Sequence, residues 1–430
     1  MRINKFFGAC LILLQFSVYF LFFWFWGRNG ILPLRILWSV FQVITLMGMV
    51  IFVFSPSKKK NPLPEGRVIA IVPVYNEDPD VLKNAIDALV NQTVEIDEIH
   101  VIDDGSDVPM AAYEHPRVFC HWQQNTGKRG AQATVLRSLD PDTYSFIITV
   151  DSDSILDELA AEIMLRAMSD PKVKACTGTV YLSNYDKNLL TRIQEFNYGI
   201  SFTISRSSRQ VIGFTETTSG ACAIYRSEIV NFHLDDYLTS GTVGDDRRLC
   251  IYSLLEGKVL FTPEAVVYTQ APETVKQLWR QRIRWSLSGW MSYPVFFTNF
   301  GLKKCIFPII NLLGSVISPL ALAALVYACF MNPISQMAIY LVYWITVNYS
   351  FATLYVLTRK QWNKRKKFLN WLFMSPLLIV FNLFMSTPSK YAALFKMKNI
   401  TWGTRGTGST APKLKKDENE KKNETKAASV

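Results

Sequence analysis

The sequence lacks the signatures of several common classes of enzyme and binding protein. Its seven cysteines are scattered without a C-x-x-C pair, and its four histidines have no metal-ligand spacing, so neither a zinc site nor a disulfide framework is expected. It has no G-x-x-x-x-G-K-[ST] phosphate loop, which excludes a P-loop ATPase. The G-x-S-x-G motif is also absent, and no G-x-G-x-x-G follows the first predicted strand.

Charge is missing from long stretches of the chain. Hydrophobic residues make up 49% of the 430 residues, although the net charge is +11 from 46 basic and 35 acidic residues. A membrane-spanning helix needs about 20 apolar residues. The sequence offers apolar stretches of about this length at 7–26, at 31–54, which carries only Arg35, and at 306–330, 336–357 and 368–388.

Basic residues beside these stretches predict their orientation. Lysines 58–60 follow the second stretch, Lys303 and Lys304 precede the third, and a basic cluster at 359–367 follows the fourth. By the positive-inside rule, the large region between the second and third stretches is cytoplasmic. The fifth stretch is basic on both flanks, so we expect a re-entrant pair of half-helices broken at Pro376. Basic residues placed beside spans explain the charge better than nucleic-acid binding does.

The region between Arg67 and about Ser292 alternates strand-like and helix-like runs. Such alternation predicts βαβ units and a mostly parallel sheet, with ligands bound outside the carboxyl ends of the strands. The predicted strands are 68–76, 98–103, 118–122, 145–151, 173–182, 221–226 and 258–268, and the predicted helices between them include 80–92, 130–139 and 155–169.

Three of the predicted strands end in polar side chains. The first ends at Tyr75-Asn76-Glu77, the second at Asp103-Asp104, and the fourth at Asp151-Ser152-Asp153. Two acids at i and i+2 lie on one side of an extended chain and repel each other unless a positive charge lies between them. Helix N-caps alone would explain one or two such strand ends, but three at one edge of a sheet indicate a ligand site.

Two basic motifs and one further acidic pair complete the set. Asn125-Thr126-Gly127-Lys128-Arg129-Gly130 opens a predicted helix and suits a phosphate, although a solvated basic turn is the alternative. Asp245-Asp246 precedes another helix, where N-capping is the alternative. Trp279-Arg280-Gln281-Arg282-Ile283-Arg284-Trp285 fits either a diphosphate and sugar site or an amphipathic helix at 276–297 on the membrane surface.

These motifs, in this order, resemble the processive family 2 glycosyltransferases. With 402–405, which reads Trp-Gly-Thr-Arg, and the two-span N-terminus, the chain looks most like hyaluronan synthases of the bacterial, single-chain type. Cellulose synthases, chitin synthases and rhizobial chitin-oligosaccharide synthases share several of the motifs. The resemblance implies an α/β GT-A (Rossmann-like) cytosolic domain inserted between transmembrane helices, with amphipathic interface helices, in a multi-pass plasma-membrane protein.

The resemblance also implies roles for individual residues. Tyr75 and Asp104 would hold the uracil and ribose of a UDP-sugar, Asp151 would support the nucleotide, and Asp153 would bind Mg²⁺ or Mn²⁺ on the diphosphate. The metal would be the positive charge between the two carboxylates. The catalytic residues would be Asp246, as base, and Asp245, which would orient its loop or bind the acceptor. The remaining implied residues are Glu77 for substrate, Lys128, Arg282 and Arg284 for phosphates, Gln281 and Trp285 for the acceptor, Ser219, Gly220 and Cys222 in an acceptor loop, and Trp402, Thr404 and Arg405 in a gating loop.

The implied enzyme inverts the donor linkage and polymerises UDP-GlcNAc and UDP-GlcUA into hyaluronan. Its partners would be these donors, the growing polysaccharide, which leaves through the protein's own channel, and membrane lipid, with no nucleic acid. Tyr340, Trp344 and Asn348 are candidate channel residues. The implied layout is 1–57 transmembrane hairpin, 58–273 cytosolic domain, 274–300 interface helices, 301–390 transmembrane region, 391–410 gating loop and 411–430 tail.

Two departures from the hyaluronan synthase pattern leave the polymer open. This chain has Gly130 where those enzymes usually have His, and Ala221 where they usually have Pro. A homopolymer synthase that uses UDP-GlcNAc or UDP-glucose is therefore the main alternative, and a short-product transferase acting on a lipid-linked sugar is another. A transporter is disfavoured because, apart from Arg35, the four clear spans carry no ionisable group.

Overall fold

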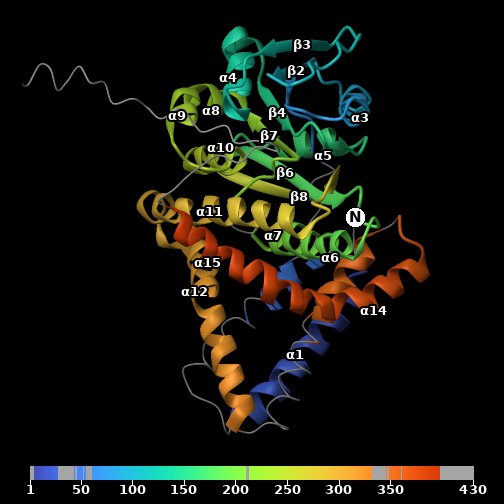
Figure 1. Ribbon diagram of the computed structural model, residues 1–430, viewed down its shortest axis with the longest axis vertical. Helices are drawn as coiled ribbons and strands as arrows, with labels where there is room; N and C mark the ends of the chain where they lie inside the picture. The colour runs from blue at the N-terminus through green and yellow to red at the C-terminus, as the bar shows by residue number, and fades with distance from the viewer. Residues whose placement is uncertain are drawn as a thin grey trace, which may run out of the picture.

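The computed structural model describes residues 4–27, 43, 46–51, 53, 54, 61–209, 213–331, 345, 348–359 and 361–397. An α/β domain forms one end of the molecule, and the apolar helices α1 (Lys5–Gly27) and α12 (Leu302–Met331) extend away from it at the other (Figure 1). The cytosolic domain and the apolar helices predicted from the sequence are thus spatially separate parts.

The sheet has eight strands in the order β3-β2-β1-β4-β7-β6-β8-β5. Strands β3, β2, β1 and β4 are parallel, and β6 is parallel to β8, but β7 runs antiparallel to both β4 and β6. Of the eight described strands, six therefore run in the same direction, and β7 and β5, which pairs antiparallel with β8, run the other way, so the prediction of a mostly parallel sheet is confirmed. The strands are β1 (Val68–Val74), β2 (Glu98–Asp104), β3 (Val118–Gln123), β4 (Phe146–Val150), β5 (Ile155–Leu156), β6 (Val173–Leu182), β7 (Cys222–Arg226) and β8 (Lys258–Thr269).

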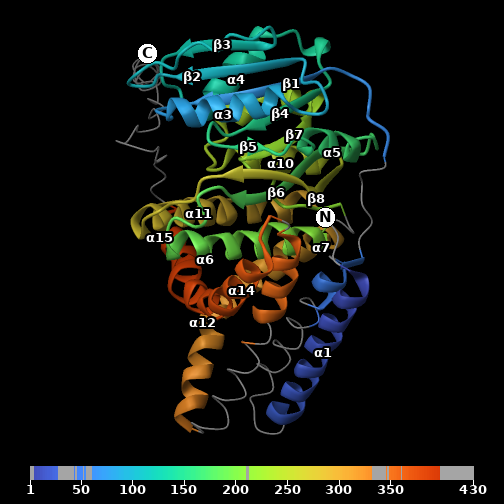
Figure 2. The same ribbon diagram turned by 90° about the vertical axis from the view of Figure 1, so that its right-hand side faces the viewer.

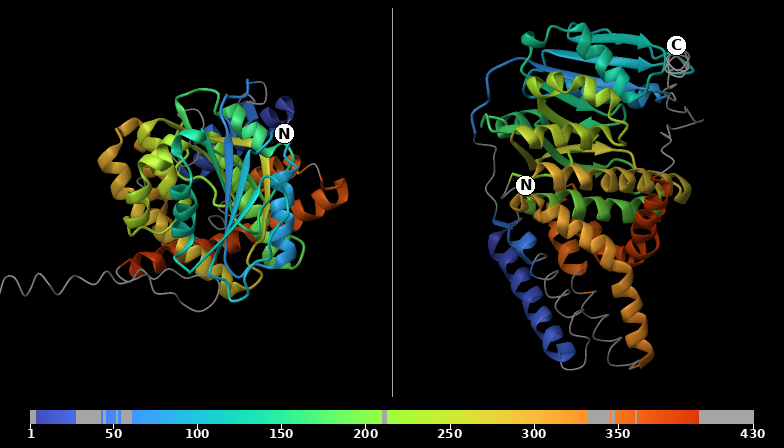
Figure 3. Two further views of the ribbon diagram at one scale, coloured as in Figure 1. Left: turned by 90° about the horizontal axis from the view of Figure 1, so that it is seen from above. Right: turned by 90° about the vertical axis from the view of Figure 1, so that its left-hand side faces the viewer.

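Helices cover both faces of this sheet because its central strands are apolar on both sides. One face packs against α3 (Pro79–Val90) and α5 (Ala160–Ala167). The other packs against α4 (Lys128–Ser138), α8 (Ser227–Phe232), α9 (Leu234–Thr239) and α10 (Asp245–Glu256) (Figures 1 and 3). The short 3-10 helix η1 (Pro141–Thr143) precedes β4.

Helix α5 begins later than its sequence pattern predicts. The prediction placed one helix over 155–169, but Ile155 and Leu156 pair with Tyr268 and Val267 of β8 instead. These two apolar residues follow the turn after β4 and add a short strand to the edge of the sheet. The helix begins only at Ala160, after the Asp157 carbonyl accepts the Ala160 backbone N–H at 2.8 Å.

A layer of helices lies between the sheet and the two extended apolar helices. It contains α6 (Leu189–Tyr198), η2 (Gly199–Ser205), α7 (Arg206–Arg209), α11 (Val275–Asn299), α14 (Lys364–Phe381), η4 (Asn382–Ser386) and α15 (Thr387–Lys396). Figure 1 shows α11 running across the long axis of the molecule, with α15 and α14 sloping below it, and Figure 2 shows this layer from another side. Apolar residues of α11 and α15 pack together with Val243 in one buried cluster, which includes Ile283, Leu287 and Ala393.

The fifth apolar stretch does not form the expected pair of half-helices. Residues 364–396 make one continuous helical run, which passes Pro376 without a break and contains the π-helical turn η4. This run is the one described helix that is long and apolar enough to cross a membrane. The apolar parts of α1 and α12 within the described residues are shorter by the same measure, and most of 31–54 and 336–357 lies outside the described residues.

A buried ion pair joins the α/β domain to the segment after the predicted fourth span. Arg359 Nη2 lies 3.1 Å from Glu195 Oε1 on α6, and both side chains are almost fully buried. The second Glu195 oxygen accepts the Leu182 backbone N–H at 2.8 Å, and the Arg359 guanidinium lies 4.0 Å from the Tyr181 ring centroid. The carboxylate thus fixes β6, α6 and the chain near Arg359 relative to one another.

Candidate active site

A cavity of about 380 Å³ lies at the carboxyl edge of the sheet. Its walls come from the ends of β1 and β4, the start of α4, the loop before β7, the start of α10 and one side of α11. Its lining contains Tyr75, Glu77, Asp104, Lys128, Asp151, Asp153, Ser219, Gly220, Asp245, Asp246, Gln281, Arg284 and Trp285, so most of the predicted site residues meet in one space.

Lys128 is the positive charge beside the first carboxylate of the β4 end. Its Nζ lies 2.5 Å from Asp151 Oδ1 and 2.9 Å from Asp245 Oδ2. The sequence predicted a phosphate contact for this lysine and a metal between the two strand-end acids. In the structure the partner of Asp151 is an ammonium group. Asp153 instead accepts the Thr269 hydroxyl of β8 at 3.1 Å.

The adjacent carboxylates Asp245 and Asp246 have pKa values that are shifted in opposite directions. Burial acts to raise the pKa of Asp245, but the nearby Lys128 ammonium outweighs it and lowers that pKa below its ordinary value. Burial and the Asp245 charge together raise the pKa of Asp246. Two neighbouring acids with separated pKa values are suited to different roles in proton transfer.

Asp104 and Arg129 hold the two loops that carry these side chains. Asp104 accepts the backbone N–H groups of Thr126 and Gly127, each at 2.8 Å, so these amides are not free for a phosphate as the sequence suggested. Arg129 points away from the cavity and donates to the carbonyl oxygens of Tyr237 and Gly244, at 3.0 and 3.3 Å. It therefore fixes the loop before Asp245 rather than a ligand.

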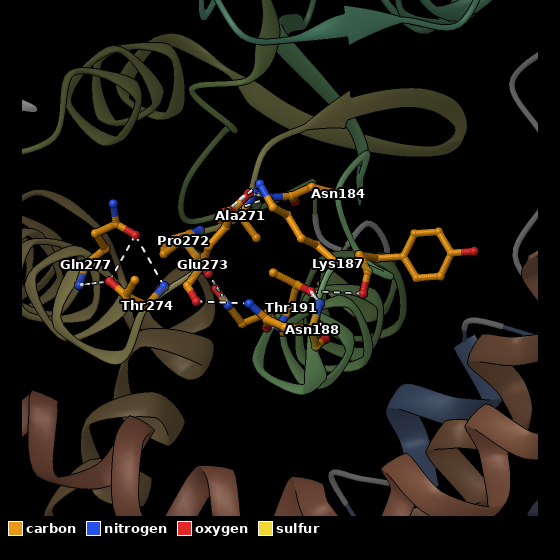
Figure 4. A network of polar contacts seen from close by, with 11 residues as sticks. Asn184, Lys187, Asn188, Thr191, Ala271, Pro272, Glu273, Thr274 and Gln277 are labelled. Atoms are coloured by element: carbon orange, nitrogen blue, oxygen red, sulfur yellow. Dashed lines mark hydrogen bonds and ion pairs between the residues drawn. The ribbon is translucent and has the colours of Figure 1, made fainter.

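A polar network fixes the connection between β8 and α11, where the chain passes from the Asp153 side of the cavity to the Gln281 side (Figure 4). Asn184 donates to the Ala271 carbonyl at 2.9 Å and receives the Ala271 N–H at 2.9 Å. Asn188 donates to the Glu273 carbonyl at 3.0 Å, and Thr274 caps α11 by accepting the Gln277 N–H at 3.3 Å. Both ends of the β8–α11 connection are thus hydrogen-bonded to residues outside the connection.

One face of α11 lines the cavity. Gln281, Arg284, Trp285 and Ser288 lie at i, i+3, i+4 and i+7, which places them on the same side of a helix. Tyr198 of α6 donates its hydroxyl to Gln281 Oε1 at 3.1 Å, and its ring lies 5.6 Å from the Trp285 ring. Helices α6 and α11 together therefore give this end of the cavity an aromatic and amide wall.

Comparisons with known proteins agree with this geometry. Residues 69–233 match the family described as Glycosyl transferase family 2. These residues form a family 2 glycosyltransferase domain. Hyaluronan synthase from Streptococcus pyogenes is 28% identical to this chain over 390 residues. The alignment covers 85% of this chain and 90% of the relative. An N-acetylglucosaminyltransferase from Rhizobium meliloti is 28% identical over 370 residues, covering 82% and 84%.

A solved structure also shares the fold. The mannosyltransferase PcManGT from Pyrobaculum calidifontis, determined with GDP-Man and Mn²⁺, matches with a TM-score of 0.53 and 15% identity. The match covers 92% of the chain described here and 98% of the mannosyltransferase. The predicted GT-A-like, Rossmann-like fold is confirmed at this level.

Several predicted residues do not line the cavity. Arg282 lies on the flank of α11 beside Trp285, and Cys222 is buried in β7, where it pairs with Val150. Trp402, Thr404 and Arg405 lie outside the described residues. Tyr340 and Trp344 also lie outside them.

The structure adds cavity residues that the sequence motifs missed. They include Tyr198 and Phe202 on the helical run after β6, Arg206 one turn further on, and Arg247 directly after the Asp245–Asp246 pair. Their spacing of four residues from 198 to 206 is a helical repeat, but such a repeat is also typical of core residues. Only the position of α6 beside α11 shows that these residues line the cavity and are not simply core residues.

Gly244 positions the Asp245–Asp246 pair, and its replacement by alanine is expected to lower kcat about 10-fold if these acids act in the reaction. Its φ is +90°, and an added Cβ would lie 2.5 Å from Ser288 Oγ on α11. The loop must then move, and a small displacement of positioned groups can lower the rate by this order. Steady-state kinetics of Gly244→Ala measures the effect.

Gly241 supplies a matched control in the same loop. Its φ is +61°, but an added Cβ meets no atom within 4 Å. Gly241→Ala therefore introduces comparable backbone strain without the contact with α11. Equal losses in the two variants would show that strain in the loop, and not the approach to α11, determines the position of the carboxylates.

Proposed function

We propose that the protein is an inverting, processive glycosyltransferase that polymerises UDP-GlcNAc and UDP-GlcUA into hyaluronan. The observation that supports it best is the single cavity that joins the Asp151–Asp153 strand end, the Asp245–Asp246 pair and the Gln281–Trp285 helix face. The similarity to hyaluronan synthase over most of the chain favours this product. The proposed layout keeps the order of parts predicted from the sequence, with the glycosyltransferase domain facing the cytoplasm, but residues 391–396 of the predicted gating loop are helical and belong to α15.

The strand-end acids fit a divalent cation that takes part of its coordination from a ligand. Asp153 lines the cavity at the edge of β4, and its Oδ1 accepts the hydroxyls of Thr269 at 3.1 Å and Ser154 at 3.4 Å. The part of the chain that the structure describes holds no group of three or more acidic, histidine or cysteine ligands. Mg²⁺ commonly uses one or two carboxylates plus substrate phosphates, so Asp153 fits such a site. A bound Mg²⁺ or Mn²⁺ would supply positive charge to the leaving diphosphate.

In the proposed reaction Asp246 accepts the proton of the acceptor hydroxyl. The acceptor oxygen forms a bond to the anomeric carbon as the bond from that carbon to the diphosphate oxygen breaks, and UDP leaves. Attack opposite the leaving group converts an α-linked donor into a β-linked product. The cation of Arg284 on the cavity wall would stabilise the departing charge, and Lys128 would keep Asp245 ionised.

The acceptor would bind between the aromatic wall and the loop before β7. Ser219 and Gly220 line the cavity, and an added Cβ at Gly220 would lie 3.2 Å from Asp151 Oδ2. This loop therefore closely approaches the acid that supports the nucleotide. The growing chain would leave past Trp285 toward α12 and the other apolar helices, which we infer to cross the membrane.

The product test uses purified full-length enzyme with single and paired UDP-sugars. We expect high-molecular-weight polymer only when UDP-GlcNAc and UDP-GlcUA are both present, and complete digestion by a hyaluronan-specific lyase. Polymer from UDP-GlcNAc or UDP-glucose alone would favour the homopolymer alternative. Short lipid-linked products would favour the third function considered above.

Asp153→Asn tests the proposed cation site. One fewer ligand charge should raise the Mn²⁺ or Mg²⁺ concentration for half-maximal activity by at least about 10-fold, as loss of a ligand contact commonly does. Titration of activity against metal gives this value. A metal dependence equal to that of the wild type would exclude coordination by Asp153.

A further inference from the structure

Arg282 is a cation that the reaction described above does not use. It lies on α11 between Gln281 and Ile283, but outside the cavity lining to which Gln281, Arg284 and Trp285 belong. Its Nη2 donates to Asn197 Oδ1 on α6 at 2.9 Å. The predicted contact with the donor diphosphate is therefore not made from this position.

Three aromatic rings surround this guanidinium. Its Cζ lies 5.5 Å from the Tyr198 ring centroid, 5.0 Å from that of Trp285 and 5.4 Å from that of Phe381. Aromatic faces attract a cation but carry no net charge to neutralise it. Burial lowers the pKa of Arg282, although the nearby Tyr198 hydroxyl acts to raise it.

The charge of Arg282 has no ionic partner within the described residues. No carboxylate lies within ion-pair distance of it, and its buried Nε–H has no acceptor. An uncompensated buried cation is costly, and such groups are concentrated at binding sites. The residue is nevertheless partly accessible, so a ligand can reach it.

The surroundings of Arg282 connect the acceptor wall to the C-terminal helices. Tyr198 and Trp285 line the cavity on one side and contact the guanidinium on the other. Phe381 ends α14, and Asn382 at the start of η4 accepts from Asn197 at 3.5 Å. A glycan that extends from the cavity past Trp285 toward α14 would therefore meet Arg282 next.

We propose that Arg282 forms a subsite that binds the carboxylate of an acidic sugar in the acceptor chain, next to the sugar held by Trp285. This inference rests on the proposed function because it assumes a glycan acceptor in this cavity. A guanidinium forms paired hydrogen bonds with a carboxylate, which a neutral sugar lacks. The subsite would thus favour an alternating acidic polymer over a neutral homopolymer.

The test measures binding of defined oligosaccharides to the purified full-length protein by calorimetry. The probes are a hyaluronan hexasaccharide, the same hexasaccharide with its carboxyl groups methyl-esterified, and a chitin hexasaccharide. Wild type should bind the acidic probe best. Arg282→Gln should weaken its binding about 10-fold, as expected for a lost charged hydrogen bond, and leave the two neutral probes unchanged.

Two variants act as controls. Arg282→Lys keeps the charge and should retain part of the preference for the acidic probe. Arg280→Gln removes an exposed cation from the same helix and should change none of the affinities. Equal weakening for all three probes in Arg282→Gln would show that the residue only supports the fold of the wall, and would overturn the proposal. So would a wild type that binds the esterified probe as well as the acidic one.

Failure of the inference and of the proposed function give different results. If the enzyme makes hyaluronan but Arg282→Gln binds the acidic hexasaccharide normally, the subsite alone is wrong. If the product is a neutral homopolymer, the proposed function is wrong, and a preserved, Arg282-dependent preference for the acidic probe would still support the subsite. Release of the acidic probe by inorganic phosphate at equal concentration would identify a phosphate site instead and would overturn the proposal.

Discussion

Asp246→Asn is expected to lower kcat about 10³-fold while the affinity for UDP changes little. An amide cannot accept the proton of the acceptor hydroxyl, and general-base catalysis typically contributes 10²- to 10⁴-fold. The substitution preserves shape, and the hydrogen bond that Asp246 Oδ1 receives from the Arg247 backbone N–H can still form to the amide oxygen. UDP binding measured by calorimetry, beside steady-state transfer rates, separates the two effects.

The pH dependence of the wild-type transfer rate also tests whether Asp246 is the base. Burial and the Asp245 charge raise the pKa of Asp246, so the acidic limb of the rate profile should lie above the ordinary carboxyl pKa of about 4. A raised carboxyl pKa also means that this group favours the folded state when protonated and that the contribution is lost as pH rises through the folded pKa. Asp246→Asn should therefore unfold no earlier than wild type at neutral pH.

Asp245→Asn is the matched control because it changes the neighbouring acid, whose pKa is lowered. It removes the partner of Lys128 but leaves the proposed base in place. We expect a smaller loss of kcat and an acidic limb displaced to lower pH, since the Asp245 charge no longer raises the pKa of Asp246. If Asp246→Asn retains polymer synthesis, or if both variants lose activity equally with unchanged profiles, Asp246 is not the base.

The strand ends were predictable because period-2 apolar runs have clear limits in this sequence. Seven of the observed strands begin and end within two residues of the predicted bounds, with Asp104 and Asp151 at or just beyond the ends of β2 and β4. The antiparallel direction of β7 was not predictable, because a strand's residues do not encode the direction of its neighbour. Ile155 and Leu156 failed as a helix start because pairing with β8 outweighed their local pattern.

Within the basic motifs the residue types were predictable but their directions were not. Lys128 and Arg129 are adjacent, yet Lys128 faces the cavity and Arg129 donates to the loop that precedes Asp245. Arg282 and Arg284 are two residues apart on α11, which places them on different sides of the helix. A linear motif gives the charge that a site needs, and only the helix orientation determines which cation supplies it.

Lys128→Met is expected to lower kcat/KM for the donor about 10²-fold and to destabilise the protein. Without the ammonium, the Asp151 and Asp245 carboxylates lose the charge that lies between them, and Asp245 is the more buried of the two. Breaking a fully buried pair costs about 3–5 kcal/mol, and we expect about 2 kcal/mol here because Asp151 is partly solvated. Thermal unfolding followed by tryptophan fluorescence measures the loss.

The cost of Lys128→Met should depend on pH in a direction that the pKa of Asp245 determines. That pKa is lowered in the wild type because the Lys128 ammonium outweighs burial, so the stabilisation is present above the unfolded-state pKa and is lost as pH falls through the folded one. The difference in unfolding temperature between wild type and variant should therefore be largest near neutral pH and shrink in acid.

An exposed pair on another helix provides the control for this change. Lys83 lies 2.7 Å from Asp87 on α3, and 63% of its side chain is accessible. Surface pairs of this kind contribute about 0–1 kcal/mol, so Lys83→Met should alter neither stability nor donor kinetics appreciably. A pH-independent loss in Lys128→Met would contradict an ionic role. The lysine would then act through the packing of its chain at the start of α4, and the low pKa of Asp245 would need another cause.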